Sequence, residues 1–95
     1  MKENLLYIIN KYGVNNQQRK LMEEIFELQE AIIKWENMSS TPGYMLVNEL
    51  KEHIEEEFAD VLNILEQFKI YYELDDDNIY KIRKQKIDRT LERIK

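Results

Sequence analysis

The sequence predicts an all-α fold, a bundle-like arrangement of four helices that assembles as an oligomer. Only two Gly and one Pro stand among the 95 residues, so there is little material for the tight turns of a β fold. Apolar residues recur at spacings of three and four, as in amphipathic helices. Charged residues make up 35% and apolar residues 43%, which is too apolar for a disordered chain. We expect residues 1–95 to form a single domain.

The first two helices are separated by a glycine. The first is predicted over Lys2–Tyr12, and Gly13 suits the position after its end, where the chain needs a positive φ. The second is predicted to run to about Asn37, with Asn15 or Asn16 as its N-cap. The polar stretch that follows, residues 39–43, is the one clear loop.

The last two helices carry recognisable start signals. Thr41 before Pro42 is typical of a cap followed by proline in the first turn, and we expect the third helix over Tyr44–Glu73. Three aspartates, residues 75–77, open the fourth helix, where negative charge suits the positive end of the helix dipole. Basic residues fill its last turns and suit the other end.

The charge of the chain is segregated. Residues 1–80 carry 7 basic and 17 acidic groups, whereas residues 81–95 carry 7 basic and 2 acidic groups. The net charge of −5 argues against a nucleic-acid polymer as partner. No apolar stretch approaches the roughly 18–20 residues of a membrane span, and the apolar run near the N-terminus is too short for a signal sequence. The absence of Cys excludes disulfides and thiolate metal sites. We therefore expect a cytoplasmic protein.

Acidic residues border the apolar stripe of the second helix. At about 100° per residue, Glu24 falls at the edge of this stripe and Glu27 lies beside it, one turn further on. The stripe predicted to form the core consists of Leu21, Ile25, Leu28, Ile32 and Trp35.

The third helix repeats this pattern. Glu57 falls at the edge of its apolar stripe and Asp60 lies beside it. If the two stripes face each other, four carboxylates converge, and burying them without a positive partner is costly. Four hard oxygen ligands suit Mg²⁺, or alternatively Mn²⁺. The alternative is a solvated acidic face, which is common on charged helices. The predicted stripe consists of Leu50, Ile54, Phe58, Val61, Leu65 and Phe68.

The fourth helix carries a basic row of Lys86, Arg89 and Arg93. Such a row suits phosphate oxygens, although it can also pair with the acidic body of the chain. The single His, His53, has Leu50 three residues before it, so the Glu-x-x-His pattern of helical di-iron sites is absent. We expect His53 at the surface rather than as a metal ligand.

Two segments, Lys20–Ala31 (KLMEEIFELQEA) and Glu56–Leu62 (EEFADVL), resemble the MazG-like, all-α nucleoside triphosphate pyrophosphohydrolases. The family signature is E-x-x-E on one helix and E-x-x-D on the next, and the resemblance covers about residues 17–93. It implies a four-helix fold that works as a homodimer or homotetramer. The four signature acids, which the resemblance makes ligands of Mg²⁺ and part of the catalytic site, are Glu24, Glu27, Glu57 and Asp60.

The resemblance also implies an activity, the hydrolysis of nucleoside triphosphates between the α and β phosphates to a monophosphate and pyrophosphate. Lys86 and Arg89, with Arg93, match the basic residues that approach the phosphates in such proteins. The base is left open, because phosphoribosyl-ATP and dUTP pyrophosphohydrolases resemble the same family. Two alternatives are a non-enzymatic helical interaction module, in which the acids pair with a basic helix, and a protein that binds nucleotides without cleaving them.

Overall fold

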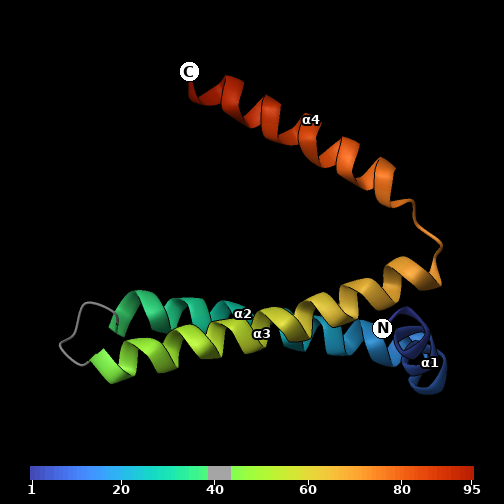
Figure 1. Cartoon of the computed structure of the whole chain (residues 1–95), viewed down its shortest axis with the longest axis horizontal. Coiled ribbons are helices and arrows are strands. Elements are labelled where there is room, and N and C mark those ends of the chain that lie inside the picture. The colour runs from blue at the N-terminus through green and yellow to red at the C-terminus, as the bar shows by residue number, and fades with distance from the viewer. Residues whose placement is uncertain (39–43) are drawn as a thin grey trace.

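The computed structural model describes residues 1–38 and 44–95, which form four α-helices and no strand. The helices are α1 (Lys2–Tyr12), α2 (Val14–Met38), α3 (Tyr44–Tyr71) and α4 (Asp76–Ile94). The predicted all-α class is therefore confirmed. Helices α2 and α3 lie side by side in opposite directions, α1 packs at one end of the pair, and α4 projects away (Figure 1). The expected cap and loop at residues 39–43 lie outside the described residues.

Gly13 alone separates α1 from α2. Its φ of 93° and ψ of 147° lie in a region that side chains disfavour, as its predicted role requires. The Gly13 amide donates to the Ile9 carbonyl at 2.9 Å, and the Gly13 carbonyl accepts from the Gln17 amide at 3.1 Å. Helix α2 thus begins directly at Val14, and the prediction of an asparagine cap at position 15 or 16 is wrong. Asn16 instead donates from Nδ2 to the Tyr12 carbonyl at 2.7 Å.

The core lies where α1 and α2 meet α3. It contains few fully buried apolar side chains, and a hydrogen bond crosses it from Nε2 of Gln17 to Oε1 of Gln67 at 2.7 Å, between two buried amides. An interior this small supplies limited hydrophobic stabilisation. The buried apolar residues among those described are Leu5, Ile9, Ala31, Leu50, Val61 and Ile64.

The contact between α2 and α3 is rotated away from the middle of the predicted apolar stripes. Ile25 is 48% exposed and Phe58 50% exposed, although both were expected in the core. Ile32 and Leu65 are exposed as well. The prediction that these residues lie in the core is wrong. Each apolar arc is wider than the surface that one neighbouring helix can cover.

The end of α3 is a Schellman-type turn. The Leu74 amide donates to the Lys69 carbonyl at 2.9 Å, and Glu73 takes a φ of 53°. Helix α3 therefore ends at Tyr71, slightly before the predicted Glu73, and it is continuous from Tyr44. An ion pair of 2.6 Å between Lys69 Nζ and Asp76 Oδ1 links α3 to the first turn of α4.

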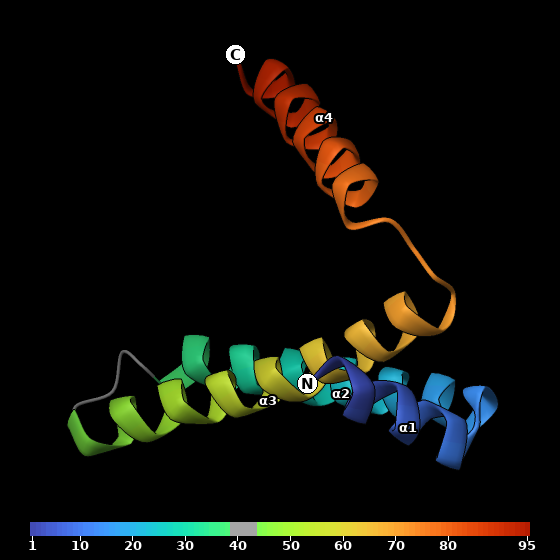
Figure 2. The ribbon, with the colours of Figure 1, turned by 45° about the vertical axis from the view of Figure 1, so that its right-hand side comes forward.

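Helix α4 stands apart from the rest of the chain. The three aspartates open it as predicted, and the structure shows that Asp75 is its N-cap: Oδ1 of Asp75 accepts from the amides of Asp77 at 2.8 Å and Asn78 at 3.2 Å. Within the described residues, α4 packs against no other helix and buries none of its side chains (Figure 2). Its apolar row, which includes Ile87 and Leu91, is exposed.

None of the helices described is long and apolar enough to span a lipid bilayer.

Replacing Gly13 with alanine tests the glycine joint. The added Cβ meets no atom within 4 Å, so the cost comes from the backbone conformation alone. We expect the free energy of unfolding to fall by about 1–3 kcal/mol, measured by urea denaturation at fixed protein concentration. Asn10→Ala, at an exposed position of α1, serves as the control and should change stability little. An unchanged urea midpoint for Gly13→Ala would contradict the assignment.

Candidate functional site

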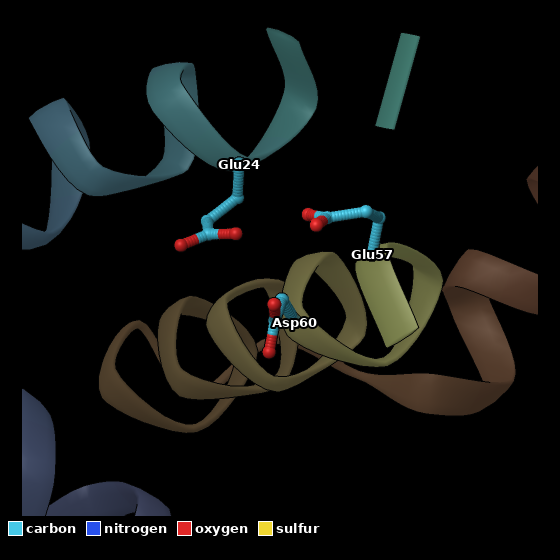
Figure 3. Close-up of side chains that lie close together, drawn as sticks. All are labelled: Glu24, Glu57 and Asp60. Carbon is cyan, nitrogen blue, oxygen red and sulfur yellow. The ribbon is translucent and has the colours of Figure 1, made fainter. Parts of the chain in front are cut away.

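Three of the four predicted acids meet between α2 and α3. Glu24 comes from α2, and Glu57 and Asp60 come from α3 (Figure 3). One carboxylate oxygen from each residue lies within 4.8 Å of the others. The spacing of three residues places Glu57 and Asp60 on neighbouring turns of one face of α3, so both can approach the same point on α2.

Glu24 is the most buried of these acids, with 8% of its surface exposed. Ala31, two turns further along the same face of α2, is also buried. Both residues lie on the face of α2 that packs against α3. Glu24 is therefore part of the helix contact. Glu57 is half-buried beside it, and Asp60 is exposed at the edge of the group.

The enclosed carboxylates lack compensation. Oε2 of Glu24 and Oε2 of Glu57 are buried, and neither has a hydrogen-bond partner among the described residues. Burial is the main cause that raises the pKa of Glu24, and the negative charge of Glu27 raises it further. A bond with Lys20 acts in the opposite direction. Two buried acceptors without hydrogen-bond partners, so close together, strongly favour the binding of a positive charge.

The side chains nearby meet this demand only in part. Lys20 Nζ lies 3.4 Å from Oε1 of Glu24, but 54% of the lysine side chain is exposed, so the pair contributes little. His53 Nδ1 lies 3.9 Å from Oε1 of Glu57, and it carries a positive charge only when protonated. His53 is exposed, as its sequence position predicted.

The donor set fits a divalent cation. The unsatisfied oxygens of Glu24 and Glu57, with an oxygen of Asp60, offer hard, negatively charged ligands from two helices. Mg²⁺ and Mn²⁺ prefer such ligands and keep several water molecules or substrate oxygens in their remaining positions. The buried, unpaired Oε2 atoms distinguish this group from an ordinary exposed acidic patch.

The fourth predicted ligand, Glu27, lies outside the group of three. It is exposed on α2, one turn after Glu24, and is close enough for its charge to raise the pKa of Glu24. With Glu57, it lines a hollow that opens toward the far end of α2. Glu27 is therefore beside the enclosed acids rather than among them.

The predicted basic residues lie on α4 and are not brought to the acids. Lys86, Arg89 and Arg93 are all exposed, and α4 packs against no other helix within the described ranges. Within one chain, then, the acidic and basic parts of the predicted site are separate.

The structure adds residues that the sequence reasoning left aside. Lys20 is exposed, yet its ammonium reaches Glu24, and the four-residue spacing between them is the available signal. Gln17, Asn63 and Gln67 line a second hollow on the side of the acids that faces α1. Their convergence depends on how α1 packs, which no local pattern reveals.

Comparison of the chain with protein-family models, curated proteins and solved structures gives no match. The site is consequently defined by its own residues and their geometry.

Replacing Glu24 with glutamine tests whether the enclosed charge is uncompensated. In EDTA at pH 7, the variant should unfold at a higher temperature than the native protein, because a neutral amide is less costly to bury. A gain of about 1 kcal/mol corresponds to roughly 4–8 °C in a chain of this size. The melting temperature can be followed by circular dichroism.

The pH dependence of this difference has a definite sign. Folding raises the pKa of Glu24, so the folded state binds the proton of this carboxyl more tightly than the unfolded state does. The stability gained from that proton is complete below the ordinary pKa of 4.5 and is lost as the pH rises through the raised value. The advantage of Glu24→Gln should therefore vanish in acid. Glu23→Gln, at the adjacent exposed acid, is the matched control and should show no such pattern. Equal melting temperatures for both variants at pH 7 would refute the prediction.

Proposed function

We propose that this protein hydrolyses nucleoside triphosphates between the α and β phosphates, in a reaction that depends on Mg²⁺ or Mn²⁺. The observation that carries the proposal is the pair of buried, unpartnered oxygens of Glu24 and Glu57 beside Asp60. These residues belong to the E-x-x-E and E-x-x-D motifs that resemble the MazG-like pyrophosphohydrolases. A solvated acidic face accounts for the motif spacing but not for the buried atoms.

Glu24, Glu57 and Asp60 would hold the metal. A bound divalent cation supplies Lewis-acid chemistry: it draws phosphate oxygens into place and neutralises charge that develops on them. The three carboxylates would set the position of the cation, because they come from two helices that pack against each other. Glu27 is exposed beside the group and lies outside this ligand set.

Hydrolysis requires a proton acceptor beside the metal. The oxygen of a water molecule forms a bond to the α phosphorus, the bond from that phosphorus to the bridging oxygen breaks, and pyrophosphate leaves with the bonding electrons. A carboxylate accepts the proton lost by the water. We assign this role to Glu27, because it borders the three acids that would hold the metal and its own side chain is accessible to solvent. Exposed Glu23 and Glu56 are the nearest alternatives in the sequence.

The active form is proposed to be a homodimer or homotetramer. Ile25 follows Glu24 and Phe58 follows Glu57, so each is turned by about 100° from its acid. In two antiparallel helices that face each other, this rotation turns both residues to the same side of the pair. The resulting apolar face is exposed and is suited to a second copy of the chain. It consists of Ile25, Ile32, Phe58, Leu62 and Leu65.

Lys86, Arg89 and Arg93 are proposed to contact the phosphates within such an oligomer. Their own α4 is held away from the acids of the same chain, whereas residues 1–80 carry an excess of negative charge that attracts a basic helix. Guanidinium and ammonium groups stabilise the charge of departing phosphates. This arrangement assigns the acidic and basic parts of one site to different chains.

A panel of ribo- and deoxyribonucleoside triphosphates tests the reaction. With Mg²⁺ we expect a monophosphate and pyrophosphate, detected by chromatography and a pyrophosphate assay, and no products in EDTA. Release of orthophosphate with a diphosphate, or no turnover of any nucleotide, would overturn the proposal. Binding without turnover would indicate a nucleotide-binding protein. If EDTA changes neither the melting temperature nor nucleotide binding, the result favours the non-enzymatic interaction module.

Glu57→Gln tests the assignment within the same assay. Losing one ligand carboxylate should lower kcat/KM by a factor of about 100 or more while the far-UV helix signal stays intact. Glu55→Gln replaces an exposed acid two residues earlier on α3 and is the matched control, with at most a small effect expected. Full activity of Glu57→Gln would remove this residue from the site.

Sedimentation equilibrium tests the assembly. The native protein should sediment at the mass of two or four chains of 11.6 kDa. Phe58→Lys, which places charge on the proposed interface, should shift the equilibrium toward the monomer. Glu52→Lys introduces the same side chain at an exposed position of α3 and should leave the mass unchanged. A stable native monomer would exclude the oligomer.

A further inference from the structure

The acids lie between two hollows of different chemistry. One hollow opens toward α1 and includes Glu24 and Asp60 in its wall. The other opens toward the far ends of α2 and α3 and includes Glu27 and Glu57. A triphosphate bound to a metal at the acids must direct its nucleoside into one of them, and the linings of the hollows differ enough to decide which.

The hollow beside α1 has the lining that a nucleoside requires. Its volume is about 520 Å³, within the range of small-molecule sites. Leu5 and Ile64 give it an apolar floor, and Ile8 adds a half-buried side chain. Tyr12 contributes an aromatic ring that can pack on a base or sugar.

Neutral amides line the same hollow. Asn63 is exposed on α3, and Gln17 and Gln67 are buried and joined by their 2.7 Å hydrogen bond. That bond holds both glutamine side chains in fixed positions, which lowers the entropic cost of using them for recognition. Amides supply donors and acceptors together, as the edges of a nucleobase require.

The opposite hollow is dominated by charge. Its lining includes Glu27, Glu30, Lys34, His53 and Glu57. Ala31 and Ile33 give this hollow apolar surface too, but an uncharged base would bury its polar edges there against solvated ionic groups.

Lys20 lies where the α1 hollow meets the acids. Its ammonium is 3.4 Å from Glu24, where it can contact the phosphate that stays with the nucleoside.

We propose that the hollow between α1 and the α2–α3 pair binds the nucleoside end of the substrate, with Asn63, Gln17 and Gln67 as its recognition residues. The inference rests on the proposed function, because it assumes that a nucleotide is bound through the acids. It assigns α1 a role beyond core packing, since this helix supplies one wall of the subsite.

A pair of matched variants tests the proposal. Asn63→Tyr places a bulky ring in the α1 hollow, and Asn37→Tyr places the same ring in the opposite one; both positions are exposed on helices. Binding of α,β-methylene ATP, with the CTP, GTP and UTP analogues in parallel, is measured by calorimetry in Mg²⁺. We expect Asn63→Tyr to weaken binding about tenfold or more and Asn37→Tyr to weaken it much less.

Inorganic tripolyphosphate separates the nucleoside from the phosphates. It lacks a nucleoside, so both variants should bind it with Mg²⁺ as the native protein does, and this also shows that they are folded. Side-chain amide resonances of Gln17 and Gln67 should shift with the methylene analogues but not with tripolyphosphate. If the native protein binds and cleaves nucleotides but Asn63→Tyr binds them normally, or Asn37→Tyr is the weaker variant, this inference alone fails. If the native protein binds none of the analogues, the proposed function fails with it.

Discussion

The contact between α2 and α3 encloses carboxylate groups, and the rest of the structure depends on that constraint. Glu24 and Glu57 each bury an oxygen without a hydrogen-bond partner among the described residues, at a cost in folding free energy. To place the acids there, the helices meet through the edges of their apolar arcs, near Ala31. Ile25 and Phe58 are consequently left half exposed. The proposed divalent cation at the acids and the proposed second chain on the apolar face therefore follow from the same geometry.

The sequence predicted the helices well because their ends have local causes. The aspartate cap of α4 depends only on Asp75 and the two amides that follow within three residues. The cap expected at the start of α2 was wrong for an equally local reason. Gly13 both ends α1 and supplies the first carbonyl of α2, which leaves no residue between the helices to act as an asparagine cap. The sequence contains both a helix-ending glycine and possible asparagine caps there, and the helix boundary lies at the glycine.

The site was predictable in part, because helical periodicity places Glu24, Glu57 and Asp60 near the apolar edge but does not say which part of a wide arc is buried. That choice depends on how two helices settle against each other. It decided that Glu24 is enclosed while Glu27, one turn further on, is exposed. The same limit applies to the amides of Gln17 and Gln67, whose sequence separation of 50 residues gives no local signal.

Helix α4 is directed away from the rest of its own chain (Figure 1). Opposite charges should draw it toward its own acidic body, yet the turn at Glu73 and the ion pair from Lys69 to Asp76 direct it outward. A helix of 19 residues that buries nothing is marginal in water, because propensity and caps rarely offset the entropy of ordering it. Its exposed apolar row suits an apolar surface on a partner, and its basic row suits an acidic one. The body of a second copy offers an apolar face and an excess of negative charge, so the direction of α4 supports the proposal that α4 pairs with another chain rather than with its own.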